Sequence, residues 1–307
     1  MPLEFPSKMY ERANRENYAI GQFNVSNLEF VQAAISAAVE LKAPIILASS
    51  SSAIRYAGIE TLVAMIRSLA DKAPVPIALH LDHGEDLAQA QLCIKHGYTS
   101  VMIDASGKPL EENIRITREV ATEAHAAGVT VEAELGRLGG IEDNVNVAAR
   151  ETFLTDPLEA QRFVRESACD ALAVAVGTSH GAYKFKGKPV LDFTRISAIK
   201  KLLGIPLVLH GASSVDPQSV EIINRYGGHL EDAHGMDEPA YREAISRGIN
   251  KVNIDTDLRL KWTAVLRKQL AEKPAEFDPR KLLGPARDAV CEVIKEKIKL
   301  LGSAGKA

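Results

Sequence analysis

The sequence of 307 residues has only three cysteines, Cys93, Cys169 and Cys291, and none of them stands in a CxxC pair. An odd number of widely separated cysteines indicates neither a disulfide framework nor a thiolate zinc site. Long apolar runs are also absent, since no run approaches the roughly 18 residues that span a bilayer, and the N-terminus lacks the apolar segment of a signal peptide. We therefore expect a cytoplasmic protein with no membrane partner.

An excess of positive charge is missing as well, because 37 Lys and Arg stand against 40 Asp and Glu, a formal net charge of −3. Nucleic-acid binding would require Lys and Arg concentrated on one face, and no such block occurs. The composition, 46% hydrophobic and 25% charged, is that of a globular protein with a large core. The sequence thus predicts one or two folded domains and no nucleic-acid partner.

What the sequence does contain is a repeated alternation of short apolar runs with segments of helical periodicity. Eight runs have strand length, at residues 18–25, 44–49, 76–83, 100–104, 129–134, 171–180, 206–210 and 251–255. Strands that alternate with helices indicate a parallel sheet. Eight such units predict a closed (β/α)8 TIM barrel, since closure removes the edges of the sheet.

The alternative to a barrel is an open, doubly wound sheet, which normally has a glycine-rich phosphate loop after its first strand. Here the first strand is followed by NVSNLEF, without that motif. The segment from about residue 258 is longer than one crossover helix requires. We therefore expect a single barrel domain over residues 1–307, with a helical C-terminal extension that packs on the barrel or on a partner subunit.

Polar side chains stand at the end of every predicted strand, where the active site of a barrel forms. In order along the chain they are Asn24, Ser49, Asp82 with His83, Asp104, Glu134, His180, His210, and Asn253 with Asp255. Burying so many polar groups without partners would be costly, so the pattern predicts a functional site at this end of the barrel. Asn24 and Ser49 are expected to contact substrate.

Three of these strand ends carry a histidine followed by a glycine. A single histidine in this position is more often a hydrogen-bonded structural residue, but three without cysteine suit a catalytic Zn²⁺ with one open position. We predict His83, His180 and His210 as the zinc ligands. His80 shares a strand face with Asp82 and is predicted to be structural.

The acidic residues divide by position along the chain. Asp82, next to His83, is a candidate proton donor and acceptor, or a carboxylate that orients the imidazole. Asp104 and Glu134 end neighbouring strands and are expected to orient ligands or bind the metal transiently. Glu142 follows the glycines of GRLGGIEDN, which predicts either a carboxylate on a mobile loop or an ordinary exposed acid.

Small residues in the last three strand-end loops suggest phosphate binding, because they expose successive backbone N–H groups. These residues are Gly181, Gly211, Ser213 and Thr256. Lys184 adds a charge in the same region. Arg259 and Arg280 are further cations, whose residue type alone favours solvated surface positions.

Six segments in sequence order, HLDHG, VMIDAS, VEAELGRLGGIED, AVGTSHGAYKF, PLVLHGAS and NKVNIDTDLR, resemble the class II fructose-1,6-bisphosphate aldolases. The resemblance covers nearly the whole chain. It implies a zinc-dependent barrel that reversibly splits fructose 1,6-bisphosphate into dihydroxyacetone phosphate and glyceraldehyde 3-phosphate. It also implies a homo-oligomer, either a dimer or a tetramer.

The resemblance further implies roles for single residues. The zinc ligands would be His83, His180 and His210; Asp82 would move the proton of the C4 hydroxyl, and Glu142 would deprotonate the ketose carbon. Asn253 resembles the amide that positions the enediolate.

Other residues match the parts of the family that hold the two phosphates. The dihydroxyacetone-phosphate end would be held by Gly181, Lys184, Gly211, Ser213, Asp255 and Thr256. Arg259 resembles the cation for the second phosphate, which Arg280 would reach from a neighbouring subunit. A monovalent cation near the phosphate loops is also implied.

Alternative functions make different demands on the sequence. Tagatose-bisphosphate aldolases resemble this chain closely, but NIDTDLR and the long loop before it favour the fructose-bisphosphate members. A zinc amidohydrolase would carry an HxH pair where Gln22 and Asn24 stand. A protein that only binds sugar phosphates would not need both Asp82 and Glu142. A Schiff-base aldolase needs a strand-end lysine, and the sixth strand ends in TSH.

Overall fold

A parallel barrel forms the body of the molecule in the computed structural model, which describes residues 3–137, 139–142, 145–147, 153–180, 191–230 and 233–307. Within these residues, eight strands close in the order β1-β11-β10-β8-β5-β4-β3-β2. They are β1 (Ile20–Asn24), β2 (Ile45–Ser50), β3 (Ile77–Gly84), β4 (Ser100–Ile103), β5 (Thr130–Leu135), β8 (Ala171–Val174), β10 (Leu207–Leu209) and β11 (Ile249–Ile254). The predicted (β/α)8 TIM barrel is confirmed.

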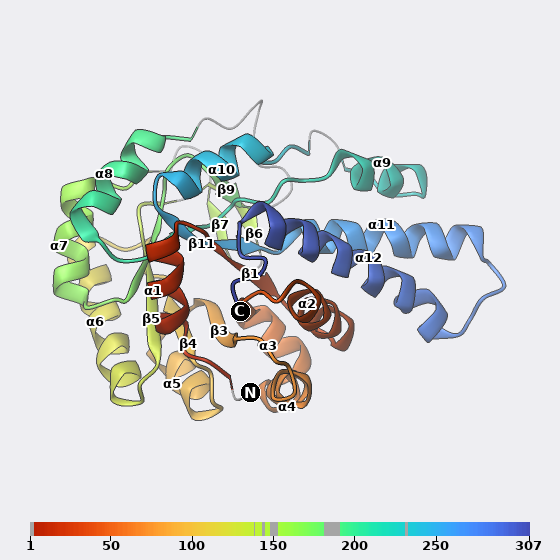
Figure 1. Ribbon diagram of the computed structural model, residues 1–307, viewed down its shortest axis with the longest axis horizontal. Coiled ribbons are helices and arrows are strands. Elements are labelled where there is room, and N and C mark those ends of the chain that lie inside the picture. Colours follow the sequence, from red (N-terminus) through yellow and green to blue (C-terminus); the bar gives the residue numbers. More distant parts are fainter. Residues whose placement is uncertain (1–2, 138, 143–144, 148–152, 181–190, 231–232) are drawn as a thin grey trace.

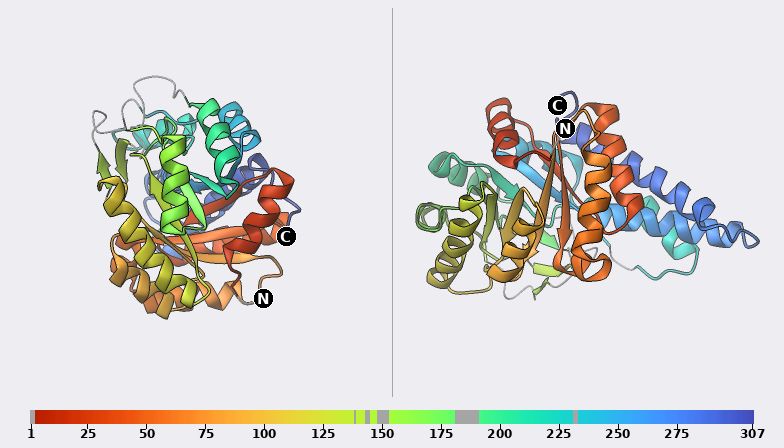
Figure 2. Two further views of the ribbon diagram at one scale, coloured as in Figure 1. Left: turned by 90° about the vertical axis from the view of Figure 1, so that its left-hand side faces the viewer. Right: turned by 90° about the horizontal axis from the view of Figure 1, so that it is seen from below.

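Helices lie around the barrel, at its N-terminal end and beyond it, as Figures 1 and 2 show. They are α1 (Pro6–Glu16), α2 (Leu28–Leu41), α3 (Ser51–Ala57), α4 (Ile59–Ala70), α5 (Leu87–Lys95), α6 (Leu110–Ala126), α7 (Pro157–Ser167), α8 (Phe193–Leu203), α9 (Pro217–Arg225), α10 (Glu238–Ser246), α11 (Thr256–Glu272) and α12 (Pro279–Leu300). Several begin at a side chain that accepts a bond from the first turn, as Asn27 does for α2 and Asp86 for α5.

The side chains of the strands alternate between two cores. Residues such as Ile45, Leu47 and Leu79 face outward and join the large core against the helices. Their neighbours Ile46 and Ala78 face inward and join a smaller core that includes residues of α1. Helix α1 therefore closes the N-terminal end of the barrel, and the inward positions at the other end are left for polar groups.

One predicted strand, residues 171–180, is wrong as a single element. The barrel strand β8 ends at Val174, and β9 (Ser179–His180) pairs with β6 (Gly139–Glu142) outside the barrel. Between them Gly177 has φ +105°, a conformation that interrupts an extended strand.

The predicted loop after β5 is partly a hairpin as well. In it β6 pairs antiparallel with β7 (Val145–Val147), which gives a three-stranded sheet in the order β7-β6-β9. Only the backbone of these residues and of His180 is described.

The C-terminal helices extend beyond the barrel. Helix α11 runs outward and α12 returns, so that the turn between them lies far from the barrel in Figure 1. Helix α12 packs against α11 and α2. Leu301 then accepts a hydrogen bond from the N–H of Ala19, 3.0 Å away, which joins the end of the chain to the start of β1. Within the described residues, no helix has the length and apolar character needed to cross a membrane.

Candidate functional site

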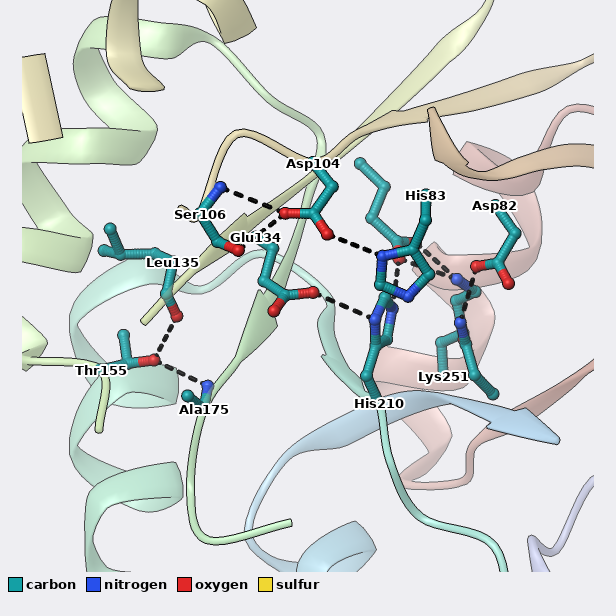
Figure 3. A network of polar contacts seen from close by, with 12 residues as sticks. Asp82, His83, Asp104, Ser106, Glu134, Leu135, Thr155, Ala175, His210 and Lys251 are labelled. Carbon is teal, nitrogen blue, oxygen red and sulfur yellow. Dashed lines mark hydrogen bonds and ion pairs between the residues drawn. The ribbon is translucent and has the colours of Figure 1, made fainter. Parts of the chain in front are cut away.

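The strand ends bring a cluster of carboxylates and imidazoles to one end of the barrel. Asp82 and His83 come from the end of β3, Glu134 from β5, and His210 follows β10 directly. Figure 3 shows the rings of His83 and His210 close together, with Asp104 and Glu134 on one side and Asp82 on the other. The two ring centroids are 4.8 Å apart.

A break in strand geometry turns His83 toward this cluster. Simple alternation would place His83 on the outer face of the barrel, opposite to Asp82. The register of β3 against β4 shifts between Leu81 and Gly84, and His83 takes φ +47°. A Cβ at Gly84 would lie 2.4 Å from the carbonyl oxygen of Met102, so only glycine fits after His83. As a result, Asp82 and His83 line the same cleft.

Asp82 is buried and held by two amides. Asn24 Nδ2 donates to one carboxylate oxygen at 2.8 Å, and Asn253 Nδ2 donates to the other at 3.0 Å. Burial acts to raise the pKa of Asp82, but the positive charges of His83, His210 and Lys251 hold it well below its usual range. The site thus contains a fixed, ionised carboxylate that can accept a proton.

His83 is oriented by a carboxylate from the next strand end. Its Nδ1 donates to Asp104 Oδ2 at 2.8 Å, and Asp104 also accepts from Ser106 Oγ at 2.7 Å. Burial acts to lower the pKa of His83, but the Asp104 hydrogen bond and the nearby carboxylates raise it above the ordinary value. The surroundings of His83 therefore favour a positive charge.

His210 lies between two buried carboxylates. Its Nε2 is 3.0 Å from Glu132 Oε1, and its Nδ1 is 3.2 Å from Glu134 Oε2. Burial lowers the pKa of the ring, and the hydrogen bonds to Glu132 and Glu134 outweigh it and raise the pKa. Both histidines thus sit where the protein supplies excess negative charge.

A buried ion pair that sequence reasoning missed lies next to His210. Lys251 Nζ donates to both oxygens of Glu132, at 2.7 and 2.9 Å, and neither side chain is exposed beyond 1%. His80 is also fully buried; its Nδ1 is 2.8 Å from Ser100 Oγ, and burial and Lys251 lower its pKa to about 3. In the sequence, the segment VEAEL indicates that Glu132 belongs to the site, because it places Glu132 and Glu134 two positions apart on one strand face.

The donor set fits a divalent cation. One ligand atom each from Asp82, His83 and His210 lie within 4.8 Å of one another, and the same holds for His83, Asp104 and Glu134. Imidazole and carboxylate groups are the usual ligands of catalytic zinc. Four carboxylates surround these rings: Asp82, Glu132 and Glu134 are buried, and Asp104 is nearly so. Their negative charge exceeds the single positive charge of Lys251, and a bound cation would balance it.

Four of the predicted substrate-binding positions, Asn24, Gly211, Ser213 and Asp255, border one cleft. It is lined by Asn24, Asp82, His83, His210, Gly211, Ser213, Asn253 and Asp255. Gly211 has φ +60°, and a Cβ there would lie 2.7 Å from the backbone of Ser179, so the β9 backbone passes directly beside the loop after His210. Thr256 is the first residue of α11 and is buried. Arg259 is half exposed and pairs with Asp255 at 2.7 Å.

Two predicted residues are not brought to the cleft within this chain. Ser49 was expected to contact substrate, and this is wrong: it is fully buried and hydrogen-bonded to the Tyr98 hydroxyl at 2.6 Å. Alternation places Ser49 on the helix-facing side of β2, whereas Ser50 pairs in register with Asp82. Arg280 belongs to the first turn of α12, at the far end of the extension, and its side chain is 88% exposed.

Four further predictions fall outside what the structure describes. Gly181 and Lys184 lie outside the described residues, and the side chains of His180 and Glu142 are not described. The backbone of His180 and of Glu142 is described: His180 ends β9, Glu142 ends β6, and His180 pairs in register with Gly140 of β6.

Comparison with known proteins gives consistent matches over the full length. A family model described as class II fructose-bisphosphate aldolase matches residues 6–306. A fructose-bisphosphate aldolase of Thermus caldophilus is 50% identical over 300 residues, covering 98% of each chain. One from Helicobacter pylori is 47% identical over 296 residues, covering 96% of each chain. In structure, the YdjI aldolase from Escherichia coli K12 superimposes with a TM-score of 0.80 at 33% identity, covering 99% of each chain.

Proposed function

The chain belongs to the class II fructose-bisphosphate aldolase family, and we propose that it reversibly cleaves fructose 1,6-bisphosphate into dihydroxyacetone phosphate and glyceraldehyde 3-phosphate. The observation that carries the proposal is the buried Asp82 carboxylate, held by Asn24 and Asn253 beside the rings of His83 and His210. An aldol cleavage needs a base at the C4 hydroxyl, and the two amides hold the Asp82 carboxylate in a fixed orientation from which it can accept that proton.

The metal of this site is proposed to be Zn²⁺, held by His83, His180 and His210. When bound, it would polarise the substrate ketone as a Lewis acid. Asp104 orients the ring of His83, and Glu134 faces His210, so both are proposed to tune the ligands or to contact the metal transiently. The buried Lys251 is engaged by Glu132 and is therefore not available as a Schiff-base nucleophile.

Two different carboxylates are proposed to carry out the two proton transfers of the reaction. Asp82 is proposed to take the proton from the C4 hydroxyl, and Asn253 to hold the substrate oxygen next to it. Glu142, on the β6–β7 hairpin, is proposed to exchange the proton at the carbon of dihydroxyacetone phosphate. Strand β6, which ends at Glu142, pairs in register with β9, which ends at His180, and this pairing supports the proposal.

The phosphates are proposed to bind at opposite ends of the cleft. Backbone N–H groups of the loops that contain Gly181, Gly211 and Ser213 would hold the dihydroxyacetone-phosphate end, with Lys184, Asp255 and Thr256 nearby and a monovalent cation beside them. Arg259 would bind the second phosphate.

Arg280 is proposed to complete the second phosphate site from a neighbouring subunit of a dimer or tetramer. Its position on the projecting α11–α12 pair supports a role in another subunit rather than its own. We further propose that the protein acts in the cytoplasm, where its three free cysteines would stay reduced.

The test is a coupled cleavage assay that compares fructose and tagatose 1,6-bisphosphates, before and after chelation and again after Zn²⁺ is added back. We expect cleavage of the fructose substrate to be lost on chelation and restored by Zn²⁺, and the tagatose substrate to react much more slowly. Full activity of the metal-free protein would reject the metal dependence, and equal turnover of the two sugars would reject the substrate assignment.

A further inference from the structure

The loop that follows β10 separates two openings in the molecule. On one side, Gly211 and Ser213 line the cleft that contains Asp82 and His210. On the other side, Ser214 and Val215 line a second cleft of about 750 Å³, whose walls also come from α11 and α12. Consecutive residues of the 211–215 loop therefore form the wall between the two openings. The N–H of Met236, just before α10, also donates to the carbonyl oxygen of Ser213 at 3.0 Å, so a neighbouring segment packs on this loop.

Polar contacts from three different helices hold this wall in place. Asp257 of α11 accepts the backbone N–H groups of Ser214 at 3.0 Å and of Val215 at 2.8 Å. The hydroxyl of Tyr241, on α10, donates to the carbonyl oxygen of Ala212. Lys297 of α12 donates to Ser214 Oγ at 2.5 Å.

Lys297 connects these contacts to one another. Its Nζ is 2.7 Å from Asp257 Oδ2 and 3.1 Å from the Tyr241 hydroxyl. The side chain is 6% exposed, and although burial acts to lower its pKa, Asp257 and Tyr241 raise it above the ordinary value. A charged lysine from outside the barrel therefore balances the carboxylate that binds the loop.

The backbone of the loop is strained where these contacts meet. Val215 has φ +54°, a left-handed conformation that β-branched residues rarely adopt. Asp257 accepts the N–H groups of Val215 and of its neighbour Ser214, and Lys297 donates to the Ser214 hydroxyl, so these contacts impose a shape that the loop would not adopt alone. The same short loop carries Gly211 and Ser213, which line the first cleft.

We propose that Lys297 is a positioning residue that fixes the 211–215 loop from behind and so sets the affinity of the site for a substrate phosphate. The inference rests on the proposed function, in which Gly211 and Ser213 bind the phosphate of dihydroxyacetone phosphate. Asp82 and His83 come from β3 and line the first cleft, whereas Lys297 lines the second cleft behind the loop. Loss of Lys297 therefore acts on phosphate binding and spares proton transfer.

The experiment compares the zinc-loaded wild type with Lys297→Met, which keeps most of the length of the side chain and removes its charge. We expect KM for fructose 1,6-bisphosphate to rise about tenfold while kcat changes less than threefold, with zinc content unchanged. Binding of inorganic phosphate, measured by calorimetry, weakens by a similar factor. Lys295→Met is the matched control, because Lys295 lies one half-turn earlier on α12 and pairs with Glu40 and Glu292 instead.

A second variant keeps the test decisive where Lys297→Met fails to fold. Tyr241→Phe removes only the hydroxyl that binds Ala212 and Lys297, and it is expected to raise KM in the same direction by a smaller factor. An unchanged KM in a folded variant, or a loss of kcat and zinc without a change in KM, overturns the inference. A wild-type protein that binds phosphate without cleaving fructose 1,6-bisphosphate would reject the proposed function, while the ratio of phosphate affinities would still decide the role of Lys297.

Discussion

At the scale of single residues, Asp82 is the position where structure and chemistry converge most directly. Asn24 and Asn253 fix both of its oxygens, so the carboxylate is ready to accept a proton before substrate arrives. We expect Asp82→Ala to lower kcat by about 10²–10⁴-fold, the range typical of a lost general base. Zinc content, measured by mass spectrometry, should stay at the wild-type level. If the variant loses zinc in proportion to activity, Asp82 serves the metal rather than the proton transfer.

Lys251 is expected to matter for stability, because it neutralises Glu132 inside the barrel. Replacement of one partner of a buried pair leaves the other charge uncompensated, so Lys251→Met should lower the free energy of unfolding by about 3–5 kcal/mol. Denaturant midpoints measure the change, with the exposed Lys299→Met as control. The double variant Lys251→Met, Glu132→Gln should regain much of the loss. Equal stability of wild type and Lys251→Met would contradict this role for the pair.

Residue types at strand ends could be predicted from the sequence, but their orientation could not. Ser49 and His83 occupy equivalent outward positions by simple alternation; only a register shift turns His83 into the cleft, and Ser49 stays outside. No feature of the sequence announces such a shift. The partners of Glu132 come from strands far apart in sequence, so they follow from barrel closure and not from local pattern.

At the scale of elements, the β6–β7 hairpin is the part that sequence periodicity described least well. Its glycines suggested a loop, whereas pairing with β9 makes it part of a small sheet. A two-residue strand such as β9 is too short to show periodicity of its own. The eight barrel strands and the helices around them were predictable, since their buried runs and apolar spacing are long enough to identify.

The hairpin also carries a prediction about Glu142. If this carboxylate exchanges the carbon-bound proton, Glu142→Ala should slow deuterium exchange into dihydroxyacetone phosphate by about 10²-fold or more. Nuclear magnetic resonance of the substrate in deuterated water follows the exchange. Asp143→Ala, the adjacent acid, serves as the control and should leave the exchange rate near that of the wild type. Normal exchange in Glu142→Ala would assign the proton transfer to another group.

At the scale of the whole molecule, the projecting α11–α12 pair predicts sites shared between subunits. Arg280→Ala should raise KM for fructose 1,6-bisphosphate about tenfold, since one charged contact to phosphate is lost. Mixing this variant with Asp82→Ala subunits gives a sharper result. In a hybrid, the Arg280→Ala subunit supplies Asp82 and the Asp82→Ala subunit supplies Arg280 to the same site. That site is complete, so activity with the wild-type KM should return. Hybrids that keep the high KM would show that each subunit relies on its own Arg280.

The barrel closes where β1 pairs with β11, the first and last of its strands, and the chain end beyond α12 binds the start of β1. In the cell, β1 leaves the ribosome long before β11 has been translated. At roughly 5–20 residues per second the interval is on the order of ten seconds or more. During that time the nascent protein exposes an unpaired strand edge, which other chains can join. Barrel closure therefore waits for β11, and until that strand has been made the edge of β1 stays open.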